Sequence, residues 1–438
     1  MKSSRLTQIR CFLMLCLTFA PLTGYGESLS LKEAVQRAVN NNPNLAESRG
    51  GIAVAEKAVE SALGRHYPRL SIDGYIMQRQ DPIAYIPAQS TTIPARFSDS
   101  YAALGPLLTL NLYQGGQVMN GVKLAELRQR MQEESFILSR NELIANTVAT
   151  YNKILQLISL TESSRRAVAA LEEQRKNAGL LFEVGRIARV DLLKVEVQKV
   201  NEEQRMLALN EALKNAGSAL HTLMGVSVSV DMPQLQLTDK LVPADVIADF
   251  ENGLALARNN SRFQLSQKAV HDAELNRELT FGKLLPTVNA LAGFSQQFGF
   301  NPNYNNGVWF AGATLTIPLF DRSSYADLSR DTLQIDRTKQ KLQGVENQIR
   351  LDLLAAQASL TESGKRIAAT QQAVEQSRES FRIEQVKYAA GSGIMADLLL
   401  AQSAEFQSEA NYTQALFDYN SAILDWHKAS GDMEVYLQ

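Results

Sequence analysis

Proline is missing from two long stretches of the chain, 107–232 and 319–438. A proline inside a helix removes a backbone hydrogen bond and clashes with the preceding turn, so its absence permits unusually long helices. Leucine, alanine, glutamate, glutamine, lysine and arginine fill both stretches, and these residues favour helix. A helix from about Gly116 to Gly179 would extend roughly 95 Å at about 1.5 Å per residue. The sequence therefore predicts very long helices as its main element.

Cysteine and histidine are scarce, which removes several classes of chemistry. The two cysteines, Cys11 and Cys16, lie near the N-terminus, and the four histidines are isolated, with no pair at the spacing of metal ligands. No phosphate-binding or dinucleotide-binding glycine motif occurs. We therefore predict no catalytic residues, no metal site and no cofactor, and a protein that is not an enzyme.

Long apolar runs are absent after the N-terminus, so no membrane-spanning helix is predicted there. At the N-terminus itself, three basic residues precede the apolar run 11–22, a pattern typical of a secretory signal peptide cleaved after Gly26. An N-terminal membrane anchor is the alternative, but the run is too short to span a bilayer. We expect residues 1–26 to be a signal peptide and the mature protein to begin near Glu27.

Cleavage would change the charge and the cysteine content. Removing residues 1–26 takes away three of the 44 basic residues and none of the 46 acidic ones, which leaves a formal charge of −5. This balance argues against a basic protein that binds nucleic acid. Both cysteines leave with the signal peptide, so the mature chain needs no disulfide outside the cytoplasm.

The mature chain is a tandem repeat, with matching residues at an offset that falls from 218 to 206 because the first repeat has the longer loop between its strands. Asn41, Asn42 and Pro68 match Asn259, Asn260 and Pro286 at an offset of 218, and Gly185, Asp191 and Gly225 match Gly391, Asp397 and Gly431 at 206. We place the first repeat at 27–225, a linker at 226–245 and the second repeat at 246–438. Each repeat reads as a short helix, a medium helix, two strands and a long helical hairpin (114–225 and 320–430).

Alternation of apolar and polar residues with a period of two predicts two pairs of strands. They span about 69–79, 100–112, 287–298 and 307–318, and residues 79–100 and 300–306 are predicted as exposed loops. Leu108, Leu110 and Leu112 lie on one face, and Thr109 and Asn111 lie on the other. Such strands suit the wall of an outer-membrane barrel. Two hairpins of a soluble sheet would explain the alternation equally well.

Apolar residues in both long helical stretches recur at steps of three and four, which predicts coiled-coil seams. The seam residues are Ile144, Val148, Tyr151, Leu155 and Ile158 in the first stretch, and Ile349, Leu353, Ala356, Leu360 and Ile367 in the second.

A repeated turn divides each stretch into two helices, with a return helix of about 35 residues. Gly185 precedes Asp191-Leu192-Leu193, and Gly391 precedes Asp397-Leu398-Leu399. Glycine just past a helix end supplies a left-handed C-cap, and aspartate in the first turn of the next helix complements its dipole. These residues either only shape the turn or also line the mouth of a pore.

With these features placed, the chain resembles the TolC-type outer-membrane factor family, the outer membrane efflux proteins, over nearly all of its mature length. The most specific parts are the strand-to-helix junctions, Leu-Tyr-Gln-Gly-Gly at 112–116 and Pro-Leu-Phe-Asp at 318–321, followed by the two turns. The junction residues are Tyr113, Gly115, Gly116, Pro318, Phe320 and Asp321.

The resemblance implies a fold that is mainly α with a small β part. Each chain of a homotrimer would contribute four strands to one shared twelve-stranded barrel in the outer membrane of a Gram-negative bacterium. The helical hairpins would continue as an α-barrel through the periplasm. Four strands cannot close a barrel, and lipid does not tolerate open sheet edges, which agrees with this assembly.

The implied function is the passive exit duct of a tripartite efflux or type I secretion system. Its partners would be an inner-membrane transporter and a periplasmic adaptor (membrane fusion) protein. The hairpin turns would form the periplasmic tip, with Gly185 and Gly391 as turn glycines and Asp191 and Asp397 as gate candidates.

Near the second turn, Gly393 and Leu400 stand where some relatives carry additional charged gating residues. The alternative function is a trimeric coiled-coil scaffold or adaptor that bridges membranes without conducting. An adaptor would normally have one hairpin flanked by β-rich domains, and this sequence has two hairpins, each preceded by a strand pair.

Overall fold

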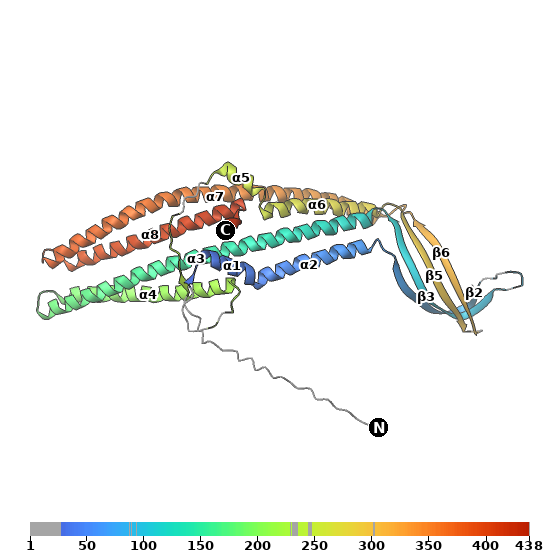
Figure 1. Ribbon diagram of the computed structural model, residues 1–438, viewed down its shortest axis with the longest axis horizontal. Coiled ribbons are helices and arrows are strands. Elements are labelled where there is room, and N and C mark those ends of the chain that lie inside the picture. The colour runs from blue at the N-terminus through green and yellow to red at the C-terminus, as the bar shows by residue number, and fades with distance from the viewer. Residues whose placement is uncertain are drawn as a thin grey trace, which may run out of the picture.

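The computed structural model describes residues 28–86, 88, 90–92, 94–227, 229, 235–243, 248–300 and 303–437. The expected signal peptide and its cleavage site lie outside the described residues. The molecule is elongated, with a β-sheet at one end and two helical hairpin tips at the other (Figure 1).

The two repeats have the same order of elements. The first contains α1 (Leu31–Asn41), α2 (Pro43–Gly64), β2 (Arg69–Ile86), β3 (Arg96–Gln114), α3 (Gln117–Glu183) and α4 (Arg189–Leu223). The second contains α5 (Phe250–Ala257), α6 (Ser261–Gly282), β5 (Thr287–Phe300), β6 (Asn303–Thr316), α7 (Arg322–Ala389) and α8 (Met395–Ser430), followed by a 3₁₀ turn at Met433–Tyr436. The mainly helical fold class is confirmed.

Two helices run nearly the full length of the helical part. α3 has 67 residues and α7 has 68, so each extends about 100 Å at ~1.5 Å per residue. The return helices α4 and α8 have 35 and 36 residues, as predicted. In Figure 1, α2 lies beside the part of α3 nearer the sheet, and α4 lies beside the part nearer the tip. α6 and α8 accompany α7 in the same way.

One asparagine in each repeat joins a stacked pair of helices. The Oδ1 of Asn42 accepts hydrogen bonds from the first amides of α2, and its Nδ2 donates to the carbonyl of Leu223 at the end of α4 at 2.9 Å. Asn260 caps α6 and donates to Ala429 at the end of α8 in the same manner. Free amides at one helix start and free carbonyls at another helix end are thereby satisfied by one side chain. This explains why these asparagines match between the repeats.

The predicted coiled-coil seams are confirmed as the core of the helical part. The seam residues from Ile144 to Leu155 on α3 and from Ile349 to Ile367 on α7 are buried. Sequence reasoning missed a small parallel ladder beside the first seam, formed by β1 (Ser28–Leu29) and β4 (Gln236–Leu237). The hydroxyl of Tyr151 lies 2.9 Å from the Leu29 carbonyl and 2.8 Å from a carboxylate oxygen of Asp239. The described part of the linker is thereby fixed to α3.

The four longer strands form one antiparallel sheet in the order β2-β3-β5-β6. The strands are longer than predicted, since β2 extends to Ile86, β3 begins at Arg96 and β5 extends to Phe300. The loops expected at 79–100 and 300–306 are therefore shorter than predicted, because 79–86, 96–100 and 303–306 belong to strands. Pairing of β2 with β3 resumes at Ile83 after a register shift that follows Gln78, and β6 begins at Asn303. Pro82 lies within this shifted stretch of an edge strand, where a residue without an N–H group is tolerated.

The register sorts the side chains of the sheet onto two faces. Leu108 pairs with Leu70 on one side and with Ala292 on the other, so these residues share a face. We call it the apolar sheet face, and its large exposed members include Leu70, Ile72, Ile76, Leu104, Leu108, Phe294, Phe300, Trp309 and Leu315. The opposite face carries polar residues such as Asn111, Asn289 and Thr109.

Candidate functional site

Both hairpin turns are built in the same way. Gly185 has a φ of +74°, and hydrogen bonds from Gly185 N to Phe182 O and from Arg186 N to Leu181 O close the end of α3 at 2.9 and 2.8 Å. The same two bonds recur around Gly391, whose φ is +73°. The predicted left-handed glycine caps are confirmed. An added Cβ would meet no heavy atom within 4 Å at either glycine, so the positive φ alone demands glycine here.

The two candidate aspartates occupy equivalent positions in different surroundings. Asp191 and Asp397 lie in the first turns of α4 and α8, whose N-cap residues make no side-chain hydrogen bond. Asp191 is half-buried and forms an ion pair with Lys194 at 3.1 Å. Asp397 is exposed and forms no ion pair with any residue that the structure describes. Both positions fit a dipole-stabilising role.

Asp191 lies near Tyr388 of the other hairpin. Burial, and then the charge of Asp191, raise the pKa of the Tyr388 hydroxyl. Among the described residues, that hydroxyl is buried without a hydrogen-bond partner. The structure therefore brings Asp191 to an unsatisfied polar atom across the two hairpins, whereas no described hydrogen bond or ion pair joins Asp191 to Asp397.

Apolar packing holds the two tips of one chain together. Ala178 of α3, Val195 of α4, and Met395 and Leu398 of α8 form one buried cluster, which we call the tip cluster. Partly buried neighbours include Tyr388 and Leu192. Separation of the hairpins at this end would expose these side chains to water.

A second contact between the hairpins lies farther from the tip, where α3 meets α8. The carboxylate of Glu409 on α8 accepts hydrogen bonds from Ser163 at 2.8 Å and Arg166 at 3.0 Å, both on α3. Arg378 on α7 donates to its other oxygen at 3.2 Å and lies 3.5 Å from the carboxylate of Glu405. We call these five residues the carboxylate clamp.

The pKa values of the two glutamates in the carboxylate clamp are shifted in opposite directions. Burial and the neighbouring charge of Glu409 raise the pKa of Glu405. Burial also opposes ionisation of Glu409, but hydrogen bonds from Ser163 and Arg166 outweigh it and hold the pKa of Glu409 below its usual range. Glu409 is therefore the anion that the clamp is built to hold, and Glu405 is the one that accepts a proton more readily.

Sequence reasoning did not identify Tyr388, Glu405 or Glu409. Tyr388 had a usable signal, because the residue three positions before each turn glycine is aromatic, Phe182 in the first repeat and Tyr388 in the second. The clamp had none, because Glu409 is 246 residues away from Ser163.

The predicted junction residues connect the sheet to the long helices. Gly115 and Gly116 have φ values of +59° and +76°, and a Cβ at Gly115 would overlap the carbonyl group of Gly282 at the end of α6. Asp321 caps α7 through the amide of Ser323 at 3.0 Å. Hydrogen bonds from Ser324 and Ser323 lower the pKa of Asp321 to about 2.

The remaining junction residues are at the surface. Tyr113 is exposed at the end of β3, and Phe320 is 79% exposed just before α7. Pro318 is half-buried after the end of β6. An exposed aromatic residue thus marks the junction in each repeat.

The part of the chain that the structure describes shows neither a metal site nor a membrane-spanning helix. No group of three or more histidine, cysteine, aspartate or glutamate side chains is arranged to hold a metal ion there. Within the same residues, none of the helices combines the length and hydropathy that crossing a membrane would require.

Comparison with known proteins agrees with this architecture. The family model described as outer membrane efflux protein matches residues 34–226 and 254–431. The chain is 24% identical over 412 residues to outer membrane efflux protein BepC of Brucella suis biovar 1, covering 90% of this chain and 86% of that protein. It is 21% identical over 415 residues to outer membrane protein TolC of Vibrio cholerae, covering 92% and 91%.

The fold is also similar to that of a solved outer membrane channel. The crystal structure of CmeC from Campylobacter jejuni superimposes with a TM-score of 0.78 at 16% identity, covering 92% of this chain and 85% of that chain. The family model matches each repeat separately, on either side of the linker. The chain therefore belongs to the outer membrane efflux protein family, and it is a TolC-type outer-membrane channel of efflux systems, a transport protein and not an enzyme.

Proposed function

We propose that three copies of the chain form one duct, with a shared twelve-stranded barrel in the outer membrane and an α-barrel in the periplasm. The observation that carries this proposal is the sheet itself. It has only four strands, and both of its edge strands, β2 and β6, lack a partner within the described chain. Unpaired edges are costly in lipid, and neighbouring copies would pair them.

The two faces of the sheet support the same assembly. The apolar sheet face would contact lipid, and the face that carries Asn111 and Thr109 would line the lumen. Thr316, beside Thr287 in the register, lies on the lumen face too. Tyr113 and Phe320 would lie at the membrane boundary, where aromatic side chains are enriched in outer-membrane barrels.

The duct would serve a tripartite efflux or type I secretion system, together with an inner-membrane transporter and a periplasmic adaptor. Helices of about 100 Å place the hairpin tips far from the sheet. An apolar groove of about 520 Å³ between α4 and α8 near the tips supports docking of an adaptor. Its lining includes Val190, Val197 and Leu400, which are exposed in the single chain.

The tips would close the duct at rest. In a trimer, Asp191 and Asp397 would each occur three times around one axis. Such rings of carboxylates give a negative mouth that favours cations, because walls of one sign focus the potential. The tip cluster would hold each pair of hairpins together in the closed state.

Mass measurement and planar bilayer recording test the assembly. The protein extracted from outer membranes in an uncharged detergent should have the mass of three mature chains and should form discrete conducting channels. A trimer that never conducts would favour the scaffold function instead. A mature inner-membrane protein that retains Cys11 would refute the outer-membrane duct.

The double variant Asp191→Asn, Asp397→Asn tests the charged mouth. Asparagine keeps the approximate turn geometry and removes the charge, and its loss of helix-start stabilisation is small. Cation selectivity and block by divalent ions should both weaken, while the trimer remains equally stable. Unchanged selectivity and block would leave the two aspartates with only a structural role at the turns.

A further inference from the structure

A large groove lies along the half of the helical part nearer the sheet. It has a volume of about 1430 Å³, and α2, α3, α6 and α7 all line it. These four helices pack side by side in that order. Since the outermost two, α2 and α7, line the same groove, the row of helices must curve around it. The groove is therefore the concave side of the row.

The two repeats contribute equivalent positions to the groove. Leu124, Met131 and Ser135 of α3 line it, and so do the residues 206 positions later on α7. Those later residues are Arg330, Arg337 and Lys341. Arg65 and Lys283, which are related by the offset of 218, line it as well. The same helix faces thus point into the groove in both repeats. At the three α7 positions the second repeat has cations where α3 has uncharged side chains, whereas Arg65 and Lys283 are basic in both repeats.

Charge of one sign dominates the groove. Its lining contains six basic residues and two acidic ones, although the whole chain has a formal charge of −2. The basic residues are Arg65, Arg128, Lys283, Arg330, Arg337 and Lys341, and the acidic ones are Asp272 and Asp331. The groove is therefore positively charged, although the chain as a whole is slightly negative.

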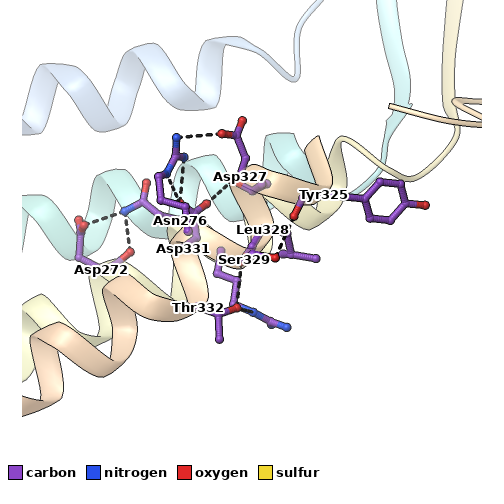
Figure 2. Close-up of polar contacts among 11 residues, drawn as sticks. Asp272, Asn276, Tyr325, Asp327, Leu328, Ser329, Asp331 and Thr332 are labelled. Atoms are coloured by element: carbon purple, nitrogen blue, oxygen red, sulfur yellow. Dashed lines mark hydrogen bonds and ion pairs between the residues drawn. The ribbon is translucent and has the colours of Figure 1, made fainter. Parts of the chain in front are cut away.

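The acidic side chains of this region already have partners. Asp272 forms an ion pair with Arg128 at 2.8 Å and accepts a hydrogen bond from Asn276 at 2.7 Å. Asp327 and Asp331 converge on one guanidinium, that of Arg330, at 2.8 and 2.9 Å (Figure 2). Burial opposes ionisation of Asp331, but Thr280, Arg330 and the charge of Lys283 together lower its pKa. Lys283 is thus partly compensated by Asp331, although no ion pair joins the two among the described residues.

Four cations of the groove are exposed and form no ion pair with any described residue. They are Arg65, Lys283, Arg337 and Lys341. Arg330, Arg337 and Lys341 are spaced by seven and four residues, so they lie on one face of α7 over about 16 Å. An anion in the groove could contact more than one of them.

The rest of the lining is uncharged and mixes polar side chains, such as Gln132, Asn276 and Gln334, with apolar ones. The apolar part offers a surface for a hydrophobic body. It includes Leu124, Met131, Leu265, Leu279, Ala58 and Ala273. We propose that this groove binds amphipathic organic anions, molecules with an apolar body and a carboxylate, sulfonate or phosphate group, as cargo in transit. The inference rests on the proposed function, because the concave side of each chain becomes the duct wall only in the trimer.

The two charged regions would then act differently on cargo. The tip aspartates would select by charge at the mouth, whereas the groove would provide a cationic surface inside the duct, repeated three times. The lysine and arginine side chains are exposed and hydrated, so binding would be weak enough to allow release, as conduction requires. Salt should weaken it, because exposed charges are screened.

A matched pair of aromatic ions tests the groove. Naphthalene-2-sulfonate should bind the purified trimer in calorimetric titrations and should block channels when added from the barrel side, which avoids the tips. The 2-naphthyltrimethylammonium ion has the same apolar body and the opposite charge, and should do neither as strongly. Equal block by both ions, or block by the cation alone, would overturn the proposal.

Two lysines of α7 supply the matched variants. Lys341→Gln removes a groove cation and should raise the Kd for the sulfonate roughly three- to tenfold, as loss of one charge-assisted contact implies. Lys339→Gln removes an exposed charge two residues away that does not line the groove, and should leave the Kd unchanged. Arg337→Gln should reproduce the effect of Lys341→Gln. Equal Kd values in all variants would refute the groove as the binding site.

The experiment separates this inference from the proposed function. Channels that conduct normally but show no sulfonate block would refute the groove and leave the duct intact. A protein that forms no conducting trimer would refute the duct, and the calorimetric titration of the same variants would still decide whether the groove binds anions.

Discussion

Replacing Glu409 by glutamine should loosen the contact between the two hairpins of one chain. The carboxylate holds Ser163 and Arg166 of α3 and Arg378 of α7. Glutamine has a similar shape and keeps one acceptor, but it removes the charge that both arginines contact. If the α3–α8 contact controls separation of the hairpins, this variant should open more easily.

The free energy lost in Glu409→Gln depends on how far Glu409 and its two arginine partners are shielded from water. Hydrogen bonds to a charged group contribute about 1.5–3 kcal/mol each when shielded from water, whereas exposed ion pairs contribute about 0–1 kcal/mol. Glu409 is 19% exposed, but Arg166 and Arg378 are 63% and 61% exposed. We therefore expect a loss of about 1–2 kcal/mol, which changes the ratio of joined to separated hairpins by roughly 5- to 30-fold.

Glu405→Gln is the matched control. It makes the same chemical change four residues away, but burial and the charge of Glu409 raise the pKa of Glu405, so its ionised form opposes the folded state. Hydrogen exchange of the α3 and α8 amides in the purified protein should therefore become faster in Glu409→Gln, and remain unchanged or become slower in Glu405→Gln. Faster exchange in both variants, or in neither, would refute this account of the carboxylate clamp.

The same two glutamates predict an order of events on acidification. The raised pKa of Glu405 means that its penalty is present at neutral pH and disappears as the pH falls through that raised value. The lowered pKa of Glu409 means that its contribution persists down to the ordinary glutamate value and is lost as the pH falls through the lowered value. Amide exchange, corrected for its intrinsic pH dependence, should thus slow slightly before it accelerates.

Two further pairs of variants test the sheet and the turns. Leu108→Lys should reduce the amount of assembled trimer more than Thr109→Lys does, because lysine at the bilayer midplane costs about 2–4 kcal/mol on a lipid face and much less on a wet lumen wall; equal yields on native gels would mean that the faces are misassigned. Gly185→Ala should cost about 1–2 kcal/mol for the left-handed backbone alone. Gly225→Ala, with a similar φ of +76°, should lower the thermal unfolding midpoint further, since its Cβ would also overlap the carbonyl of Asn41; similar midpoints for the two variants would contradict this close packing of Gly225 against the end of α1.

Features that are local in the sequence and occur in both repeats could be predicted from the sequence alone. Absence of proline predicted the long helices, and Gly185 and Gly391 predicted the turns, because a left-handed cap requires a particular residue type. The match between Asn42 and Asn260 was visible in the sequence. Their role in linking two helices was not, since the carbonyls that they bind lie 181 and 169 residues away.

Sequence reasoning failed where proline was taken as a loop signal or where contacts join distant segments. Pro82 suggested that the strand ends before it, but an edge strand with a register shift accommodates it. The ladder between β1 and β4 joins two-residue segments, which are too short for any periodic pattern. The exposed cations of the groove were not visible as a group in the sequence. Arg65 and Lys341 reach the same groove only because four helices pack in a row that curves around it.

The two hairpins have similar backbones but carry different charges at positions related by the offset of 206. In the first hairpin, Glu172 of α3 pairs with Lys199 of α4 at 3.1 Å. The equivalent residues of the second hairpin are Arg378 and Glu405, which lie 3.5 Å apart with the signs of charge reversed. An ion pair therefore joins the two helices of each hairpin at this position, but the acidic and basic residues have exchanged helices.

The reversed ion pair changes which residues the next glutamate along the return helix can bind. Glu203 and Glu409 are equivalent at the offset of 206. Glu203 lies four residues after Lys199, and Glu409 lies four residues after Glu405. Glu203 bonds to Lys199 of its own helix at 3.3 Å. In the second hairpin that neighbour is an acid, Glu405, so Glu409 has no cation beside it on α8 and turns to arginines on α7 and α3 instead. The ion pair that stays within the first hairpin thus becomes, in the second, a link between hairpins.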